Sequence, residues 1–303
     1  MKREDILDKM KKNIYEKFLQ DILENKERHE SAYEKIKEKV NQSTAYYHGH
    51  PVSFLYHAIL LDQEKVSMIK DKLHKLNNIL KKVTARYLED PEFRSFFRFP
   101  ELMEELILID PGYEIEYPVA RFDFFNPYQE DKFKFCELNT DGTSAMNEVR
   151  VLQREFSDSS LITDIETDYN LKGFELFHSL IDDLLDNYCQ FCGKDEVNPN
   201  IAIVDFKGDG TINEFKEFKK RFEERGYKTV ICDPREMEYK RGKLYCDDLK
   251  IDLVYRRATT NRIVEEGDKI GDFLQAYRDG SVCVVGGFRS QIPHNKIIFS
   301  ILH

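Results

Sequence analysis

The sequence has no excess of positive charge. Its 303 residues include 46 Lys and Arg against 56 Asp and Glu, so the formal net charge is −10 at pH 7. Proteins that bind nucleic acids or anionic membranes do so through basic surfaces. We therefore expect neither a nucleic acid nor a membrane as a partner, although a local basic pocket is compatible with this total.

Long apolar runs are also missing. The sequence contains no run of the roughly 18 apolar residues that indicates a transmembrane helix, and its first residues, MKREDILDKMKKNIYEK, lack the apolar centre of a signal peptide. These absences predict a cytoplasmic protein. At 41% hydrophobic, the chain has enough apolar side chains for two or three subdomains.

Cysteine is scarce and scattered. The six cysteines do not form a dense framework, and we expect reduced thiols. Cys189 and Cys192 make one CxxC pair, but no second CxxC or HxxxH pair of ligands follows it, as a structural zinc site requires. A helix end with two half-buried thiols is the expected structure.

Glycine-rich phosphate motifs are absent as well. Neither GxGxxG nor GxxxxGK[ST] occurs in the sequence. The segment DFKGDGTINEFK resembles a calcium loop in having Gly210 at its sixth position, but Lys207 and Lys216 occupy ligand positions three and twelve. We reject a calcium site, and we interpret GDG as turn chemistry, with a cradle for a phosphate or carboxylate as the alternative.

Three regions differ in their patterns. Apolar residues at helical spacing predict helices at about 4–40, 64–87 and 101–108, and hence a helical N-terminal region, 1–115. In the C-terminal region, 196–303, the runs at 201–206, 228–234, 251–256 and 282–287 predict strands of an open α/β layer. A hairpin turning at Arg241-Gly242 and helices at about 213–227 and 269–277 complete it. With a hairpin and helix at 116–195, the fold class is mixed α/β.

The stretch FKFCELNTDGTSAMNEVR, residues 133–150, carries polar residues where a strand leaves its apolar part. If 117–125 and 133–139 pair as a hairpin, Asp123 lies opposite Glu137 and Arg121 lies opposite Asn139. Phe125 then lies opposite Phe135 on this face, and the other face holds Ala120, Phe122, Phe124, Cys136 and Leu138. The two-residue period of strands makes this sorting sensitive to any slip in register.

Two directly opposed carboxylates repel each other unless a positive charge lies nearby. A divalent cation, Mg²⁺ or Mn²⁺, would resolve the repulsion, because Asp123, Glu137 and the Asn139 side-chain oxygen are hard ligands. Arg121 would then bind a phosphoryl oxygen beside the metal. The alternative is a surface hairpin in which Arg121 neutralises the two acids.

Four segments taken in order, ARFDFF, FKFCELNTDGTSAMNE, IDLVYRR and GSVCVVGGFRSQIPHNKIIFSIL, resemble the landmarks of the circularly permuted ATP-grasp ligases, in particular the glutathionylspermidine synthetase-like group. The resemblance covers about residues 115–303. It implies an ATP-grasp-like metal hairpin, an open pre-ATP-grasp layer, and ATP-dependent joining of a small-molecule or peptide carboxylate to an amine through an acyl phosphate.

The resemblance also assigns roles to single residues. Arg121 would stabilise the transferred phosphate, Asp123, Glu137 and Asn139 would hold Mg²⁺, and Ser144 would lie near the acceptor substrate. The family's usual Ala-Asp-Thr-Pro turn is replaced here by Thr140-Asp141-Gly142-Thr143, so the acceptor side of the site is expected to differ.

Three further residues are candidates for contacts with ligands. Arg256 and Arg257 end a predicted strand, and at least one of them is expected to face the acidic hairpin or an anionic substrate. Lys296 is the remaining candidate for a phosphate contact. Because the segment that supplies the family's phosphate-binding lysines would follow His303, we expect an incomplete ligase without ATP turnover. The rival readings are a non-catalytic binding module and a purely structural hairpin.

Overall fold

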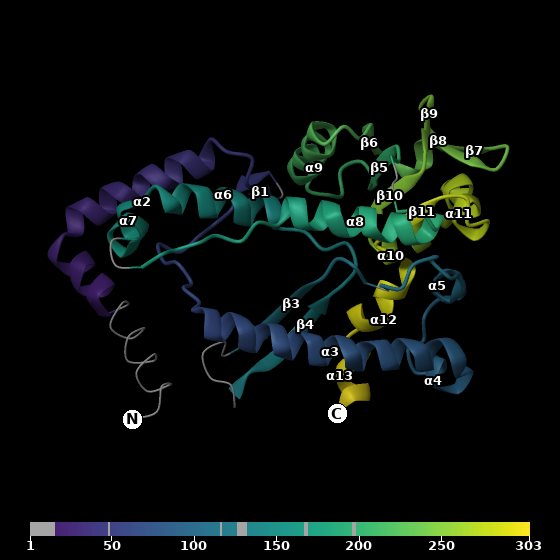
Figure 1. Cartoon of the computed structure of the whole chain (residues 1–303), viewed down its shortest axis with the longest axis horizontal. Helices are drawn as coiled ribbons and strands as arrows, with labels where there is room; N and C mark the ends of the chain where they lie inside the picture. Colours follow the sequence, from purple (N-terminus) through teal and green to yellow (C-terminus); the bar gives the residue numbers. More distant parts are fainter. Residues whose placement is uncertain (1–15, 48, 116, 126–131, 167–168, 196–197) are drawn as a thin grey trace. The chain divides into compact units, whose positions relative to one another are not determined.

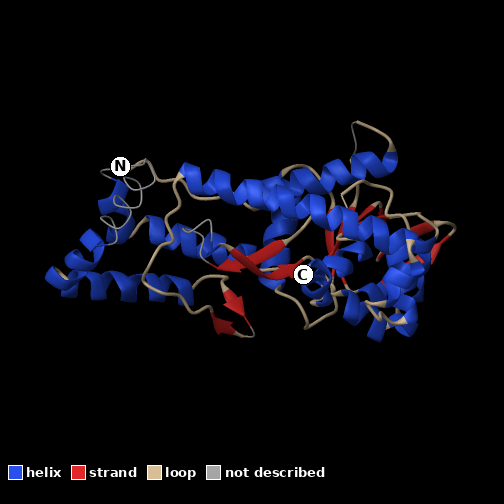
Figure 2. Cartoon of the chain, turned by 90° about the horizontal axis from the view of Figure 1, so that it is seen from below, coloured by secondary structure: helices blue, strands red, loops and turns tan. Residues whose placement is uncertain are grey.

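The computed structural model describes residues 16–47, 49–115, 117–125, 132–166, 169–195 and 198–303. The chain divides into two compact units, each made of two separate stretches of sequence. The first unit comprises 1–59 and 145–176, and the second comprises 60–144 and 177–303. Helices predominate, and the strands form several small sheets (Figure 2). The mixed α/β fold class is confirmed, and both predicted region boundaries lie inside the second unit.

The first unit is mainly helical. Residues 16–24 form a helix that ends at Asn25, where α2 (Lys26–Asn41) begins. The predicted continuous helix at 4–40 is thus interrupted, and its residues 4–15 lie outside the described part of the chain. The unit also contains β1 (Tyr46–Tyr47), β2 (His50–Pro51), α6 (Met146–Ser157) and α7 (Ser160–Glu166). Its buried apolar centre consists of Ile36, Val40, Phe156 and Ile162.

A buried histidine joins three segments of the first unit. His29 on α2 is 3% exposed, and its two ring nitrogens lie 2.6 Å from an Asp21 carboxylate oxygen and 3.1 Å from the Tyr56 hydroxyl. Both nitrogens therefore have a hydrogen-bonding partner, as a buried imidazole requires. This arrangement accounts for His29 as a structural residue of the unit.

The second unit contains a four-stranded parallel sheet in the order β11-β10-β5-β6 (Figure 1). Its strands are β5 (Ile201–Val204), β6 (Thr229–Cys232), β10 (Leu253–Arg256) and β11 (Cys283–Val285). Strand β5 is buried along its whole length, as strands of a parallel sheet covered on both faces are. The helix α9 (Ile212–Glu224) connects β5 to β6, which confirms the predicted strand-helix-strand unit.

The hairpin that was predicted to turn at Arg241-Gly242 belongs to a three-stranded antiparallel sheet. Its strands are β7 (Met237–Lys240), β8 (Lys243–Cys246) and β9 (Leu249–Ile251). Arg241 and Gly242 have φ values of 52° and 72°, the conformation that a two-residue hairpin turn requires at both central positions. The predicted single strand at 251–256 is in fact shared between β9 and β10, which belong to different sheets.

The second unit also contains several helices and a separate two-stranded hairpin. The helices are α3 (Gln63–Glu89), α4 (Pro91–Ser95), α5 (Glu101–Leu108), α8 (Phe177–Cys192), α10 (Thr260–Glu265), α11 (Gly271–Arg278), α12 (Gln291–His294) and α13 (Ile297–Leu302), with the short 3₁₀ turns η2 (Pro234–Glu236), η3 (Gly267–Lys269) and η4 (Phe288–Ser290). Among the apolar residues whose spacing predicted α3, Leu76, Leu80, Val83 and Tyr87 are buried. Within the described ranges, no helix is both long and apolar enough to cross a membrane.

The cysteines differ in part from the prediction. Cys189 and Cys192 lie in the last turn of α8, partly exposed, as expected. Cys232 and Cys246, however, are joined by a disulfide, so the expectation of six reduced thiols is wrong for this pair. Cys232 ends β6 and Cys246 ends β8, so the bond links the parallel sheet to the antiparallel one. The sequence gave no sign of this pairing, because the two cysteines belong to different sheets.

Candidate functional site

The predicted hairpin is present in the second unit as β3 (Arg121–Phe125) and β4 (Lys134–Asn139) (Figure 1). Arg121 pairs with Asn139 and Asp123 pairs with Glu137, as the sequence predicts. Directly opposed residues of an antiparallel pair place their side chains on the same face. The four candidate residues are therefore brought together on one face of a two-stranded sheet.

Beyond these pairs, the register changes through a β-bulge. Phe124 lies opposite Phe135 and Phe125 lies opposite Lys134, so the predicted pairing of Phe125 with Phe135 is wrong. Cys136 is the extra residue of the bulge and is exposed rather than packed with Leu138. The bulge reverses the faces on which the residues before Cys136 lie. Phe135 therefore contacts Phe122 and Phe124 instead of extending the polar face.

Each carboxylate on the polar face has a cation of its own. Arg121 Nε lies 3.3 Å from Asp123 Oδ1, and Lys296 Nζ lies 3.3 Å from Glu137 Oε1. The Asn139 amide donates a hydrogen bond of 3.3 Å to Glu137 Oε2. This bond and the ammonium group of Lys296 hold the pKa of Glu137 below its ordinary value. The repulsion between the two acids is thus relieved within the protein itself.

The donor set of this face is small. It comprises two carboxylates and one amide, and no group of three or more His, Cys, Asp or Glu side chains in the described ranges is placed to hold a metal ion. The side chains of Asp123 and Glu137 are 42% and 37% exposed, so both are accessible from solvent. A hydrated cation that keeps several waters, as Mg²⁺ does, would match such a site better than a fully enclosed ion.

Ser144 lies just beyond the hairpin and is half-buried. Its carbonyl accepts a hydrogen bond of 3.4 Å from Arg121 Nη1, so the backbone at Ser144 helps to orient the arginine. Between Asn139 and Ser144, the loop 140–143 is largely buried. The structure thus places the backbone of Ser144 beside Arg121.

Arg256 is buried within the second unit, 3% exposed. Its Nη2 lies 2.8 Å from an Asp141 carboxylate oxygen, and its other donors reach the carbonyls of Ala258, Gly286 and Gly287. Its guanidinium also lies over the Phe288 ring at 4.6 Å. Arg256 therefore faces Asp141 in the loop that follows the hairpin, and not the acidic face of the hairpin itself.

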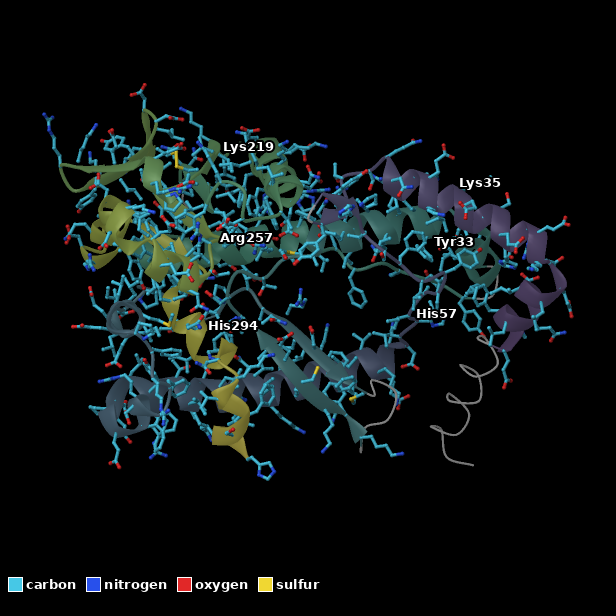
Figure 3. All side chains as sticks on the ribbon, turned by 180° about the vertical axis from the view of Figure 1, so that it is seen from behind. Tyr33, Lys35, His57, Lys219, Arg257 and His294 are labelled. Carbon is cyan, nitrogen blue, oxygen red and sulfur yellow. A yellow bond between two sulfur atoms is a disulfide. The ribbon has the colours of Figure 1, made fainter. Side chains whose placement is uncertain are left out.

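Arg257, labelled in Figure 3, is 4% exposed and lies at the end of β10. Its Nη2 is 2.9 Å from Glu214 Oε1 on α9, and its Nη1 donates to the Thr143 carbonyl. Buried arginines need such partners because an isolated charge in the interior is very unfavourable. The two arginines are thus engaged by the protein and organise the loop 140–143.

The sequence did not single out the partners of these arginines. Asp141 and Glu214 are both buried carboxylates, 6% and 0% exposed, and each pairs with a strand-end arginine. The only signal was indirect: two adjacent arginines at the end of an apolar strand need counter-charges if they are buried. Nothing in the local sequence identifies which acids these are.

Comparison of the chain with protein-family models finds no matching family. No curated protein matches the sequence either.

Proposed function

We propose that the hairpin is the metal site of an ATP-dependent carboxylate–amine ligase of the circularly permuted ATP-grasp type. The observation that supports this most directly is the pairing of Asp123 with Glu137 beside Arg121 and Asn139 on one accessible face. Arginine, two carboxylates and an amide are the residue types that phosphoryl transfer needs around its metal and phosphate.

In this proposal, Asp123, Glu137 and Asn139 hold Mg²⁺ or Mn²⁺, and Arg121 stabilises the phosphoryl group of ATP. When bound, Mg²⁺ neutralises charge on the phosphates. Lys296, whose exposed side chain pairs with Glu137 beside this face, is the candidate for a phosphate contact. The buried Arg256 and Arg257 serve the loop and not the substrate, while Ser144 remains a candidate for the acceptor side.

The substrates are a small-molecule or peptide carboxylate and an amine, and the proposal places the reaction in the cytoplasm. The Cys232–Cys246 disulfide is the observation that argues against this location, because disulfides are uncommon there. The second candidate function is a non-catalytic binding module that keeps the hairpin. It is favoured by the ion pairs that Arg121 and Lys296 form with the two acids.

Glu137→Gln is expected to weaken Mn²⁺ binding at least about tenfold, because the exchange removes one of two anionic ligands. In EDTA the variant should melt near the wild-type temperature, since the pair with Lys296 is exposed. Isothermal titration with Mn²⁺, with and without ADP, measures the affinity, and melting in EDTA monitors the fold.

Glu105→Gln is the matched control, because Glu105 also pairs with a cation, Arg278, at 2.6 Å in the same unit. It should leave Mn²⁺ binding unchanged. Equal Mn²⁺ affinity in wild type and Glu137→Gln, or no binding at all, would leave the hairpin as an ion-paired surface element. If Mn²⁺ and ADP bind, substrate-dependent ADP release with candidate peptides and polyamines would support the ligase and overturn the expectation that residues 1–303 alone do not turn over ATP.

A further inference from the structure

The parallel sheet of the second unit has a point at which its connections diverge. Strand β5 continues through α9 to β6 on one side, and β10 continues through α10 and α11 to β11 on the other side. The carboxyl ends of β5 and β10, which are direct neighbours, lie at this point. In open α/β sheets, ligands bind outside the strand ends at such a point.

Here the chain's own carboxylate lies at this edge of the sheet. The Asp141 side chain is 2% exposed and accepts hydrogen bonds from Arg256 at 2.8 Å and from the Thr260 N–H and hydroxyl at 2.7 and 2.8 Å. Burial opposes its ionisation, but Arg256 and Thr260 more than offset this and hold the pKa of Asp141 below its ordinary value. Asp141 is therefore bound as an external anion would be.

The rest of the loop 140–143 is held as closely. The Thr140 hydroxyl donates to the Ser290 carbonyl at 2.6 Å, and the Ser290 hydroxyl donates to Asp141 at 3.3 Å. Gly142 has a φ of 61°, and a Cβ there would lie 2.8 Å from Thr259 Cγ2 and 3.1 Å from the carbonyl oxygen of Arg257. Both the conformation and the close approach require glycine.

This loop also supports the hairpin. The Thr143 hydroxyl donates to the Asn139 carbonyl at 2.8 Å, which fixes the backbone of one proposed metal ligand. Arg121 donates to the carbonyl of Ser144, the residue that follows the loop. The backbone of the loop 140–143 thus connects the polar face of the hairpin to Asp141.

The loop supports the opposite side of the site as well. Ser290, which makes two hydrogen bonds with the loop, immediately precedes α12. Two residues beyond the end of α12 is Lys296, the partner of Glu137. Asp141 therefore lies where the hairpin, the start of α12 and the edge of the parallel sheet meet.

We infer that Asp141 is a positioning residue. Through its hydrogen bonds at the carboxyl end of the parallel sheet, it holds the hairpin and Lys296 in place relative to each other. The inference rests on the proposed metal site for its functional consequence. In this inference, the carboxyl end of the parallel sheet helps to organise the metal site. The carboxylate of Asp141 lies where an open α/β sheet usually binds a ligand.

The test compares two variants that both lower stability. Asp141→Asn keeps the shape of the side chain but removes the charge that Arg256 and Thr260 bind. Leu244→Ala removes a fully buried side chain of β8, outside the loop and the hairpin. At a temperature at which both are folded, Asp141→Asn should bind Mn²⁺ at least about tenfold more weakly than wild type, and Leu244→Ala should bind it equally well.

A second measurement needs no metal. Hydrogen exchange in EDTA should be faster at residues 134–139 in Asp141→Asn than in wild type, and unchanged there in Leu244→Ala. If Asp141→Asn does not fold, Thr143→Val removes only the hydroxyl that bonds the Asn139 carbonyl, and the same two measurements apply. The exchange experiment thus reports on positioning independently of metal binding.

The outcomes separate the two proposals. Weaker Mn²⁺ binding together with faster hairpin exchange in Asp141→Asn alone supports the positioning role. Wild-type Mn²⁺ affinity in Asp141→Asn, the same loss in Leu244→Ala, or unchanged hairpin exchange overturns it. If wild type binds no Mn²⁺ while the hairpin exchange still rises in Asp141→Asn, the metal site fails and the positioning of the hairpin by Asp141 stands.

Discussion

Replacement of Glu214 by Gln is expected to lower the free energy of unfolding by about 3–5 kcal/mol. Glu214 is fully buried and lies 2.9 Å from Arg257, which is itself 4% exposed. Glutamine keeps the size of the side chain and one acceptor, but it removes the carboxylate charge that pairs directly with the buried guanidinium. Removal of one partner of a buried pair is strongly destabilising because the remaining charge cannot reach water.

Urea denaturation of the variant and wild type measures this difference. Glu223→Gln is a suitable control, because Glu223 also lies on α9 and pairs with Lys219 at 2.5 Å, but its side chain is 49% exposed. A pair of that kind should contribute less than about 1 kcal/mol. A loss of less than about 1 kcal/mol in Glu214→Gln, as in the control, would mean that Arg257 is stabilised by other groups and that its pair with Glu214 adds little.

Asp205→Asn is expected to stabilise the protein at neutral pH. Asp205 follows β5, and its burial raises the pKa of its carboxyl to about 6, against the hydrogen bond from the Phe206 N–H and the charge of Arg257. At about 1.4 kcal/mol per pH unit, the difference from the ordinary value of 3.8 corresponds to about 3 kcal/mol. Asparagine retains an acceptor for Phe206 without the buried charge.

The sign of the pH dependence follows from proton binding. Between pH 3.8 and about 6, the folded protein holds the Asp205 proton more tightly than the unfolded chain does. Wild type therefore loses stability relative to Asp205→Asn as the pH rises through this range, and the two should be equally stable below it. Melting at several pH values tests this. Asp209→Asn, which removes an exposed partner of Arg262, should give no such gain.

The pairing of the hairpin was predictable because polar residues recur at every second position on both of its strands. Only one register places Asp123 opposite Glu137 and Arg121 opposite Asn139, and the structure has this register. The bulge at Cys136 was not predictable. Beyond it the residues are mainly phenylalanines, which pack equally well on either side of a strand, so the sequence pattern does not record the change of face.

The α/β layer was predictable because each strand is a short apolar run bounded by a turn, and α9 lies between two such runs. The strand-end position of Arg256 predicted a contact with the acidic hairpin or an anionic substrate, whereas its partner is Asp141 in the loop after the hairpin. Its partner Asp141 was hidden because TDGT is ordinary turn chemistry when only local sequence is considered. The Cys232–Cys246 disulfide was hidden for a related reason, since its cysteines belong to two different sheets.

The contact between Asp141 and Arg256 joins residues 115 positions apart, and the contact between Asp141 and Ser290 spans 149 positions. Contacts of such high sequence separation are formed late, because the entropy of closing a long loop has to be overcome first. During synthesis, the hairpin emerges well before the arginine and the serine that hold its loop. Its final placement therefore has to wait until Arg256 and Ser290 have left the ribosome. A stalled or shortened product that ends before Arg256 would carry an undocked, acidic hairpin loop.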